Sequence, residues 1–239
     1  MNLADLFISR AYAEEAKDPY ISFKLEPRFN KVGQNGWIAL GVVVLFAVVM
    51  LVVILTNKKK KWTVRMLTNG AIAISLSFVL SFIRLARMGN GGSVTLASML
   101  PMMLFSAVYG VGPGMITGVV YGMLQYIQGP EVVHWAQMLL DYPIAFAMLG
   151  LAGLYKPFAA KKKDWLLFIS IFVAAFGRFV CHTFAGIFWY GEGESASWSF
   201  MVKLWTSVLY NGNYMLWDTL ICLAVAVPVY RPVMKIMKG

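Results

Sequence analysis

Residues 165–190 read WLLFISIFVAAFGRFVCHTFAGIFWY, and this stretch decides the fold. It exceeds the roughly 20 apolar residues that a helix needs to cross the hydrocarbon core of a bilayer. Two strongly polar side chains, Arg178 and His182, interrupt it. A charge at the bilayer centre costs roughly 2.5 to 3.5 kcal/mol even on lenient insertion scales, so such residues usually face a bundle interior and mark a ligand or ion pathway. The stretch therefore predicts a transmembrane helix with a functional face.

Further apolar segments follow the same pattern, separated by charge runs and Gly/Pro clusters. At 59% hydrophobic and 13% charged residues, the 239-residue chain is too apolar for a soluble domain and too long for a single anchor. The seven predicted helices cover residues 37–56, 64–83, 93–109, 113–128, 135–155, 165–190 and 202–230. Two of them, 93–109 and 113–128, are shorter than a full span. The predicted fold is an all-α integral membrane protein.

The formal net charge of +10 falls mainly in the predicted loops. Alternate loops carry the basic residues Lys58, Lys59, Lys60, Lys61, Arg65, Lys156, Lys161, Lys162, Lys163, Arg231, Lys235 and Lys238. The opposite side carries most of the acidic residues, and Arg84 and Arg87 are its basic exceptions. By the positive-inside rule, the N-terminus lies outside and the C-terminus lies in the cytoplasm. This placement favours a lipid bilayer over nucleic acid as the partner of the basic residues.

Composition divides the chain into three regions. Residues 1–36 mix charged residues with Pro and Gly and predict an extracytoplasmic N-terminal arm. Residues 37–57 are rich in Val and Leu without a polar interior and predict an extra transmembrane helix that acts as a tether. Residues 58–239, whose six predicted helices carry small and polar residues on their faces, predict the functional core.

Small residues recur at helical spacing in two segments. Gly114, Gly118 and Gly122 form a flat stripe on one helix face, which is typical of close helix packing. Ala73 and Ser77 form a second small-xxx-small pair. Packing is again the simplest interpretation, but an outward-facing patch of this kind could dock another membrane protein.

Two prolines and one glycine-rich loop are expected to shape a cavity. Pro101 and Pro143 interrupt predicted helices and free backbone carbonyls that neighbours or water must satisfy. The loop at 88–92 contains three glycines and is a plausible lid.

Polar groups from three predicted helices reach a similar depth. Counting about 1.5 Å per residue from the outer end places Asp141 roughly 9 Å deep and His182 and Asn211 roughly 12 Å deep. Helical spacing adds neighbours on the same faces: His134 and Gln137; Arg178, Gly186 and Trp189; Ser207, Tyr214 and Asp218. Aromatic residues frame these rows: Trp135, Tyr142, Trp189, Tyr190, Trp198 and Trp205. Such a cluster beside a buried carboxylate could hold a flat cationic ring.

Structural interpretations of these residues stay open. Asp141 and Arg178 could form an ion pair between two helices, and His182 could be an interior histidine that donates to a carbonyl. The aromatic residues could belong to an interfacial belt. Cys181 and Cys222 both fall within predicted spans and support neither a disulfide framework nor a zinc site, so no metal is predicted.

Several ordered blocks within 64–232 carry a family resemblance. They are GGSV at 91–94, LLDY at 139–142, LGLAG at 149–153, HTFAG at 182–186 and YNGNY at 210–214. In these blocks the chain resembles the thiamine-specific S component of energy-coupling factor (ECF) transporters. The resemblance implies a six-helix membrane subunit that captures thiamine outside the cell. It also implies partners, namely a transmembrane coupling subunit and two cytoplasmic ATPases.

The resemblance assigns candidate ligand contacts residue by residue. The family's acidic contact falls on Asp141, followed by Tyr142, and its histidine, glycine and asparagine fall on His182, Gly186 and Asn211. The stacking tryptophan aligns with Tyr190, or with Trp189 after a shift of one residue. A family tyrosine is Thr206 here, so Trp205 or Tyr210 could compensate. Gln137 shares the face of Asp141. The docking pair on the first core helix corresponds to Ala73 and Ser77.

Thiamine is a permanent thiazolium cation joined to an aminopyrimidine, and the candidate residues suit it. One carboxylate offsets the charge, and the carboxamide and imidazole can read the pyrimidine edge. No cofactor is expected; ATP would be used by partner subunits, because the sequence contains no G-x-x-x-x-G-K-[ST] phosphate loop.

Two other functions compete with thiamine binding. The same architecture could bind another vitamin or a thiamine precursor. Alternatively, Asp141 and His182 could relay protons in a proton-coupled secondary transporter. An enzyme is not expected, because the two histidines form no H-E-x-x-H pattern.

Overall fold

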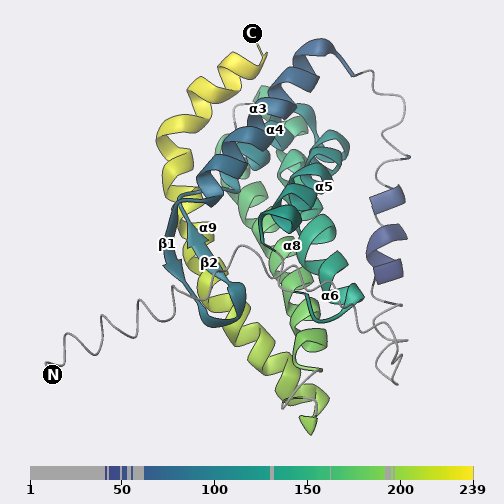
Figure 1. Ribbon diagram of the computed structural model, residues 1–239. Helices are drawn as coiled ribbons and strands as arrows, with labels where there is room; N and C mark the ends of the chain where they lie inside the picture. Colours follow the sequence, from purple (N-terminus) through teal and green to yellow (C-terminus); the bar gives the residue numbers. More distant parts are fainter. Residues whose placement is uncertain are drawn as a thin grey trace, which may run out of the picture.

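The computed structural model describes residues 41, 43–48, 50–52, 55, 62–129, 132–161, 163–191, 195 and 197–238 (Figure 1). The predicted arm at 1–36 lies outside the described residues. The predicted extra helix at 37–57 is described in part, and its described residues are helical. Val43, Phe46 and Met50 from this helix pack against the core cluster that contains Leu140 and Phe188.

From Trp62 onward the described chain is mainly helical, with one β-hairpin. The elements are α3 (Val64–Ser81), β1 (Arg84–Arg87), the 3₁₀ turn η1 (Gly89–Gly91), β2 (Ser93–Thr95), α4 (Leu100–Tyr109), α5 (Val111–Gln128), α6 (Trp135–Leu139), the π-helical turn η2 (Leu140–Ile144), α7 (Ala145–Ala147), the 3₁₀ helix η3 (Met148–Lys161), α8 (Trp165–Trp189) and α9 (Phe200–Lys238). The segments α6 to η3 run on as one broken rod. Helix α9 extends along the bundle, with the hairpin packed against it (Figure 1).

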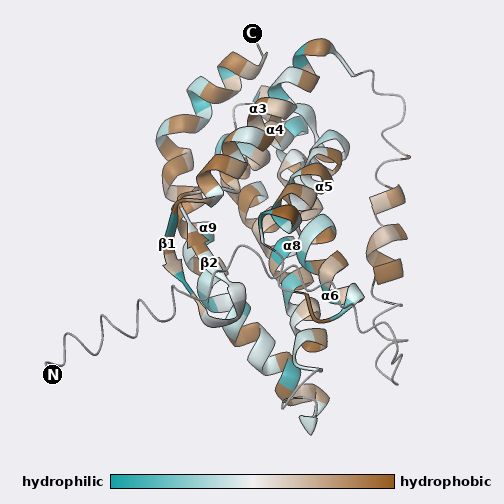
Figure 2. Cartoon of the chain, viewed as in Figure 1, coloured by the Kyte–Doolittle hydropathy of each residue, from teal (hydrophilic) through white to brown (hydrophobic). Residues whose placement is uncertain are grey.

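Four helices in the described part of the chain are long and apolar enough to cross a bilayer: Val64–Ser81, Trp135–Lys161, Trp165–Trp189 and Phe200–Met237. Figure 2 shows hydrophobic residues along the outer helices and hydrophilic residues on β1. The prediction of an all-helical membrane protein is confirmed in its class.

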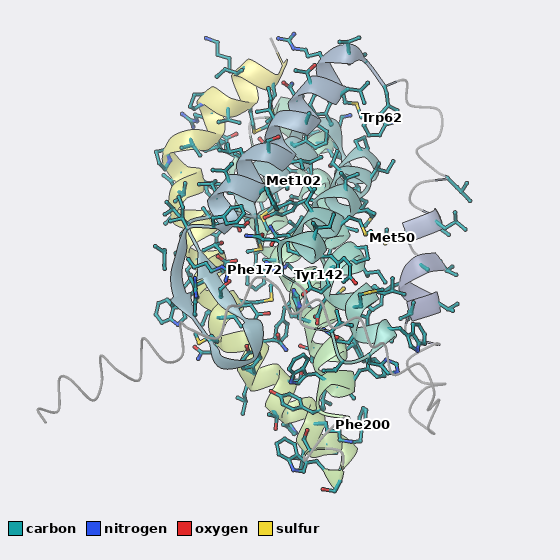
Figure 3. All side chains as sticks on the ribbon, in the orientation of Figure 1. Met50, Trp62, Met102, Tyr142, Phe172 and Phe200 are labelled. Carbon is teal, nitrogen blue, oxygen red and sulfur yellow. The ribbon has the colours of Figure 1, made fainter. Side chains whose placement is uncertain are left out.

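Helix α4 explains why 93–109 looked too short for a span. Residues 100–108 are all buried, and Met102 lies inside the bundle (Figure 3). A helix that is apolar on every side can be enclosed by protein as readily as by lipid. The high hydropathy of this segment therefore reflects burial inside the protein, and not contact with lipid.

The prediction of one helix over 93–109 is wrong at its start. Residues 93–95 form β2, which pairs antiparallel with β1. Ala97 has a φ of 55°, a left-handed conformation that a continuing helix does not permit. Pro101 does not interrupt a helix; it lies in the first turn of α4, where a missing N–H costs nothing.

The glycine stripe on α5 packs against the broken rod, as predicted. A Cβ at Gly114 would lie 2.9 Å from the Gly150 Cα, and one at Gly118 would lie 2.9 Å from the Ala147 Cα. A Cβ at Gly122 would lie 2.9 Å from the Tyr142 carbonyl carbon. Only glycine allows the two backbones to approach so closely. This contact sets the position of the turn that carries Asp141.

The predicted docking pair on α3 does not face outward. Ala73 and Ser77 are 1% and 0% exposed, and the Tyr121 hydroxyl donates to the Ser77 carbonyl at 3.1 Å. These small residues admit α5, so their role is packing. The exposed small pair on this helix is Ala71 and Ser75.

Candidate ligand-binding site

A cavity of about 240 Å³ opens between the hairpin, α5, the α6–η2 segment, α8 and α9. Its charged and amide-bearing lining residues are Arg84, Gln125, Gln128, Gln137, Asp141, Arg178, His182, Asn211 and Asp218. Its aromatic lining residues are Tyr121, Tyr142, Phe146, Trp189, Tyr190, Tyr210 and Tyr214. Concave sites that join aromatic walls to a few convergent polar groups are typical of small-molecule binding.

The turn that carries Asp141 departs from the α-helix for a chemical reason. Pro143 has no N–H, so it cannot donate to the carbonyl of the preceding turn. The Ala145 N–H instead reaches back five residues to the Leu140 carbonyl, which closes a π-helical turn over Leu140–Ile144. Such turns are frequent at functional sites. Here the turn places Asp141 and Tyr142 on the cavity wall.

Asp141 is held by two donors. Its Oδ1 lies 2.6 Å from the His182 Nδ1, and its Oδ2 accepts from the Gln137 Nε2 at 2.6 Å. The Val133 N–H donates to the Gln137 Oε1 at 3.1 Å, which orients that amide. The Asp141 side chain remains 22% exposed. Part of the carboxylate is therefore open to a ligand.

The interior ion pair joins Arg178 to Asp218, and not to Asp141 as the structural alternative had it. The Arg178 Nε donates to the His182 Nε2 at 3.1 Å, and its Nη1 lies 3.7 Å from the Asp218 Oδ2. The guanidinium also lies 4.4 Å above the centre of the Phe146 ring. Asp141 therefore pairs with His182, and Arg178 with Asp218. The hydrogen bond from Arg178 to His182 connects these two pairs.

Asn211 joins α9 to α8. Its Nδ2 donates to the backbone carbonyls of Ser207 at 2.9 Å and of His182 at 3.2 Å. Its Oδ1 accepts from the Tyr214 hydroxyl at 2.9 Å. Because these bonds engage both ends of the carboxamide, Asn211 orients the histidine backbone in addition to lining the cavity.

Gly186 serves the same helix contact. A Cβ at this position would lie 2.9 Å from the Ser207 Cβ and in contact with the Ser207 hydroxyl. That hydroxyl in turn donates to the Thr183 carbonyl at 2.8 Å. Gly186 lines the cavity, but its lack of a side chain is required by the packing of α9.

Of the aromatic residues proposed as ligand contacts, some line the cavity and one does not. Trp189 and Tyr190 both line the cavity, and Tyr190 stacks on Trp198 with ring centres 5.8 Å apart. Trp205 does not line it: its side chain is 59% exposed on α9. The reason is helical phase, because the inward row of α9 runs through Ser207 and Asn211.

Sequence reasoning missed several contributors to the cavity, among them Thr95 and Gln128. Thr95 was expected in a helix, whereas its N–H and its hydroxyl both donate to the Asp218 Oδ1 at 2.9 Å. Gln128 was not singled out; its Nε2 has no hydrogen-bond partner among the described residues and its side chain lines the cavity. Gln125 and Gln128 lie three residues apart on α5, and this spacing could have indicated a polar face toward the cavity.

Comparison with known proteins identifies the family. The sequence model of the family described as thiamine transporter protein (Thia_YuaJ) matches residues 67–238. The chain belongs to the thiamine transporter family. This is a transport family and not an enzymatic one. Its match spans α4 to α9 and most of α3, including every helix that lines the cavity.

The similar proteins and the similar solved structure are also named as thiamine transporters or ThiT. The chain is 30% identical over 162 residues to thiamine transporter ThiT of Bacillus subtilis. This alignment covers 64% of this chain and 82% of that protein. It is 27% identical over 142 residues to thiamine transporter ThiT of Lacticaseibacillus paracasei, covering 53% and 68%. The fold is similar to a solved structure of ThiT from Listeria monocytogenes, with a TM-score of 0.61 and 22% identity, covering 72% of this chain and 96% of that one.

Proposed function

We propose that this chain is the high-affinity thiamine-binding S component of an ECF-type importer in a bacterial cell membrane. The observation that carries the proposal is the Asp141 carboxylate, which is held by His182 and Gln137 on the wall of an aromatic-lined cavity. Membership of the thiamine transporter family supports thiamine as the solute.

The chemistry of the cavity suits the two rings of thiamine. The carboxylate of Asp141 offsets the thiazolium charge or accepts from the aminopyrimidine, and the His182 edge borders the same space. Trp189 and Tyr190 offer faces on which a planar cation stacks, and cation–π attraction adds about 0.5 to 2 kcal/mol for each such contact.

A fluorescence titration tests the proposal directly. We expect thiamine to quench the tryptophan emission of the purified chain with a dissociation constant in the nanomolar range, because Trp189 lines the cavity. Biotin and nicotinic acid, which lack a fixed positive charge, serve as controls. Absence of any response at micromolar thiamine would reject the proposal, and a stronger response to another vitamin would reassign the solute.

Transport requires partners on this proposal. We infer a transmembrane coupling subunit and two cytoplasmic ATPases, because the sequence carries no phosphate-binding loop of its own. On α3, the exposed pair Ala71 and Ser75 replaces the buried pair as the candidate contact surface. The charge distribution favours an external N-terminus and a cytoplasmic C-terminus. Under this orientation the cavity opens toward the outside.

A proton-coupled secondary transporter is the second candidate, favoured by the 2.6 Å contact between Asp141 and His182. Uptake of thiamine by the purified chain in proteoliposomes distinguishes the importer subunit from the secondary transporter. An importer subunit binds thiamine but does not accumulate it when only a pH gradient is applied, whereas a secondary transporter does.

A further inference from the structure

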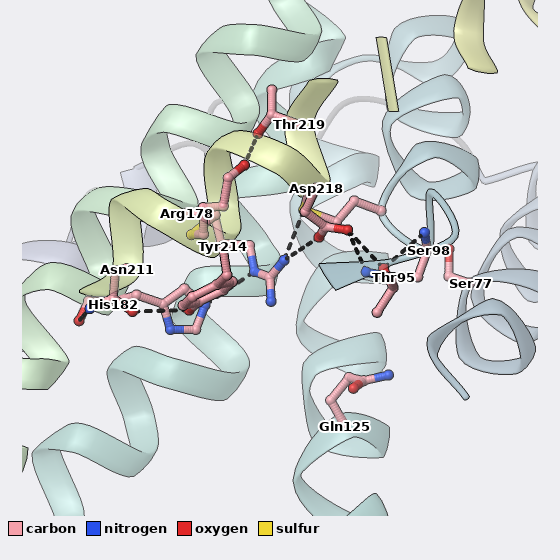
Figure 4. Close-up of polar contacts among 12 residues, drawn as sticks. Ser77, Thr95, Ser98, Gln125, Arg178, His182, Asn211, Tyr214, Asp218 and Thr219 are labelled. Carbon is pink, nitrogen blue, oxygen red and sulfur yellow. Dashed lines mark hydrogen bonds and ion pairs between the residues drawn. The ribbon is translucent and has the colours of Figure 1, made fainter. Parts of the chain in front are cut away.

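Five cavity residues form a continuous chain of polar contacts that reaches from the ligand side to the hairpin. It runs from Asp141 to His182, from His182 to Arg178, from Arg178 to Asp218, and from Asp218 to Thr95. Figure 4 shows the contacts from His182 to Thr95, with Arg178 between His182 and Asp218. The five residues come from η2, α8, α9 and β2, so the chain joins four elements that enclose the cavity.

Arg178 sets the proton position on His182. A guanidinium only donates, so the His182 Nε2 that receives its Nε at 3.1 Å is the unprotonated nitrogen. The proton then lies on Nδ1, which donates to the Asp141 Oδ1 at 2.6 Å. His182 is neutral in this arrangement, and Asp141 is its acceptor.

Asp218 compensates Arg178 and fixes the hairpin at the same time. It is 2% exposed; its Oδ2 lies 3.7 Å from the Arg178 Nη1, and its Oδ1 accepts two hydrogen bonds from Thr95. With His182 neutral, the carboxylates of Asp141 and Asp218 and the guanidinium of Arg178 leave one net negative charge in the cavity interior. The only other charged residue among the described cavity lining is Arg84, which is exposed on β1, where water screens it.

We propose that Asp218 and Arg178 determine the charge specificity of the site: Asp218 cancels the guanidinium, so that Asp141 faces the ligand as an uncompensated carboxylate and the cavity selects a monocation. This proposal rests on the proposed function, since the monocation is thiamine. Asp218 acts through Arg178 and is a positioning residue. Arg178 acts through the His182 tautomer and the local charge.

Three variants of the full chain separate charge from structure. Asp218→Asn keeps an acceptor for Thr95 and removes the negative charge, so the interior becomes neutral. The double variant Arg178→Gln with Asp218→Asn restores one net negative charge, and glutamine retains a donor for His182. Thr95→Val weakens the tie to the hairpin without changing any charge.

The measurement compares thiamine with its neutral isostere deazathiamine, in which a thiophene replaces the thiazolium ring. We expect Asp218→Asn to weaken the binding of thiamine at least tenfold. The binding of deazathiamine should weaken less than about threefold. The double variant recovers thiamine affinity to within about threefold of the parent, and Thr95→Val changes both ligands equally. Equal losses for both ligands in Asp218→Asn, or no recovery in the double variant, overturn the proposal.

A ligand-free measurement keeps the inference testable by itself. Nitrogen-15 histidine spectra of the chain report the His182 tautomer, with His134→Asn used for assignment, because the sequence contains two histidines. We expect a neutral ring protonated on Nδ1, and a proton on Nε2 instead overturns the role of Arg178. If the parent chain does not bind thiamine, the proposed function fails while this spectrum still decides the tautomer.

Discussion

At the scale of single residues, Asp141 is the group on which recognition of a cation depends. Asp141→Asn keeps the size of the side chain and removes its charge. We expect thiamine binding to weaken at least tenfold, which corresponds to about 1.4 kcal/mol, because a partly desolvated carboxylate attracts a cation strongly. Tryptophan fluorescence titration measures the effect.

Asp164→Asn is the matched control, because Asp164 does not line the cavity. It removes a carboxylate from the same chain and should leave thiamine affinity unchanged. An Asp141→Asn variant that binds like the parent would make Asp141 a structural residue only.

Gly186 provides a second prediction, on packing. Gly186→Ala inserts a methyl group against the Ser207 Cβ at 2.9 Å, so α9 must move. Overpacking of this kind costs about 1 to 3 kcal/mol, and we expect a lower melting temperature together with weaker thiamine binding. Ser207→Gly in the same chain makes room for the methyl group and should restore part of both. If the single variant melts and binds as the parent does, helices α8 and α9 are not in the contact described.

At the scale of elements, the broken rod from α6 to η3 is the decisive feature. Replacing Pro143 by Ala supplies the missing N–H and removes the ring that prevents a regular α-helix. We expect Pro143→Ala to raise or preserve the melting temperature while weakening thiamine binding several-fold, because a regular helix rotates Asp141 away from His182. Thermal unfolding followed by circular dichroism, with titration of the same sample, measures both.

Pro228→Ala is the control for this experiment, because Pro228 lies inside α9 away from the cavity lining. It should change stability without a specific loss of binding. Equal affinity of Pro143→Ala and the parent would show that the π-helical turn is not needed for the site.

At the scale of the whole molecule, Asp164 connects the start of α8 to the C-terminal part of α9. Tyr230 donates to it at 2.8 Å and Arg231 at 3.1 Å. The hydrogen bond from Tyr230, and then the contact with Arg231, hold the pKa of the Asp164 carboxyl below its usual range. A lowered carboxyl pKa gives stability that is present above the unfolded pKa of about 3.9 and is lost as the pH falls through the folded value.

The pH dependence of stability tests this connection. We expect Asp164→Asn to melt below the parent at pH 7, and the difference to shrink as the pH falls from about 4 through the lowered pKa of the folded state, below which the carboxyl is protonated in both states. Melting temperatures across this range, at constant ionic strength, provide the measurement. A difference that stays constant with pH would mean that the ionised form of Asp164 contributes nothing.

The buried row of residues on α9 shows how much of the site helical spacing alone could predict. Ser207, Asn211, Tyr214 and Asp218 were grouped by periodicity, and all four are buried. Trp205 was named as a framing aromatic residue and again through the resemblance, but its position two residues from Ser207 turns it outward. Spacing predicts which residues share a face, whereas it does not show which face the neighbouring helices cover.

The hairpin and the docking pair mark the limit of local patterns. An apolar run at 93–109 resembles one short helix, but residues 93–95 pair with β1, and Thr95 donates to Asp218, more than a hundred residues away. Ala73 and Ser77 match a docking motif as well as a packing motif. Their burial is decided by α5, so only the fold separates the two interpretations.

The sequence by itself determined that this chain enters a bilayer and which polar side chains share a helix face, because hydropathy and helical periodicity are properties of neighbouring residues. The tertiary structure alone decided that Asp141 pairs with His182, that Arg178 pairs with Asp218, and that a strand closes the cavity. Those outcomes depend on contacts between residues 40 to 123 positions apart, whose geometry follows from how the helices pack.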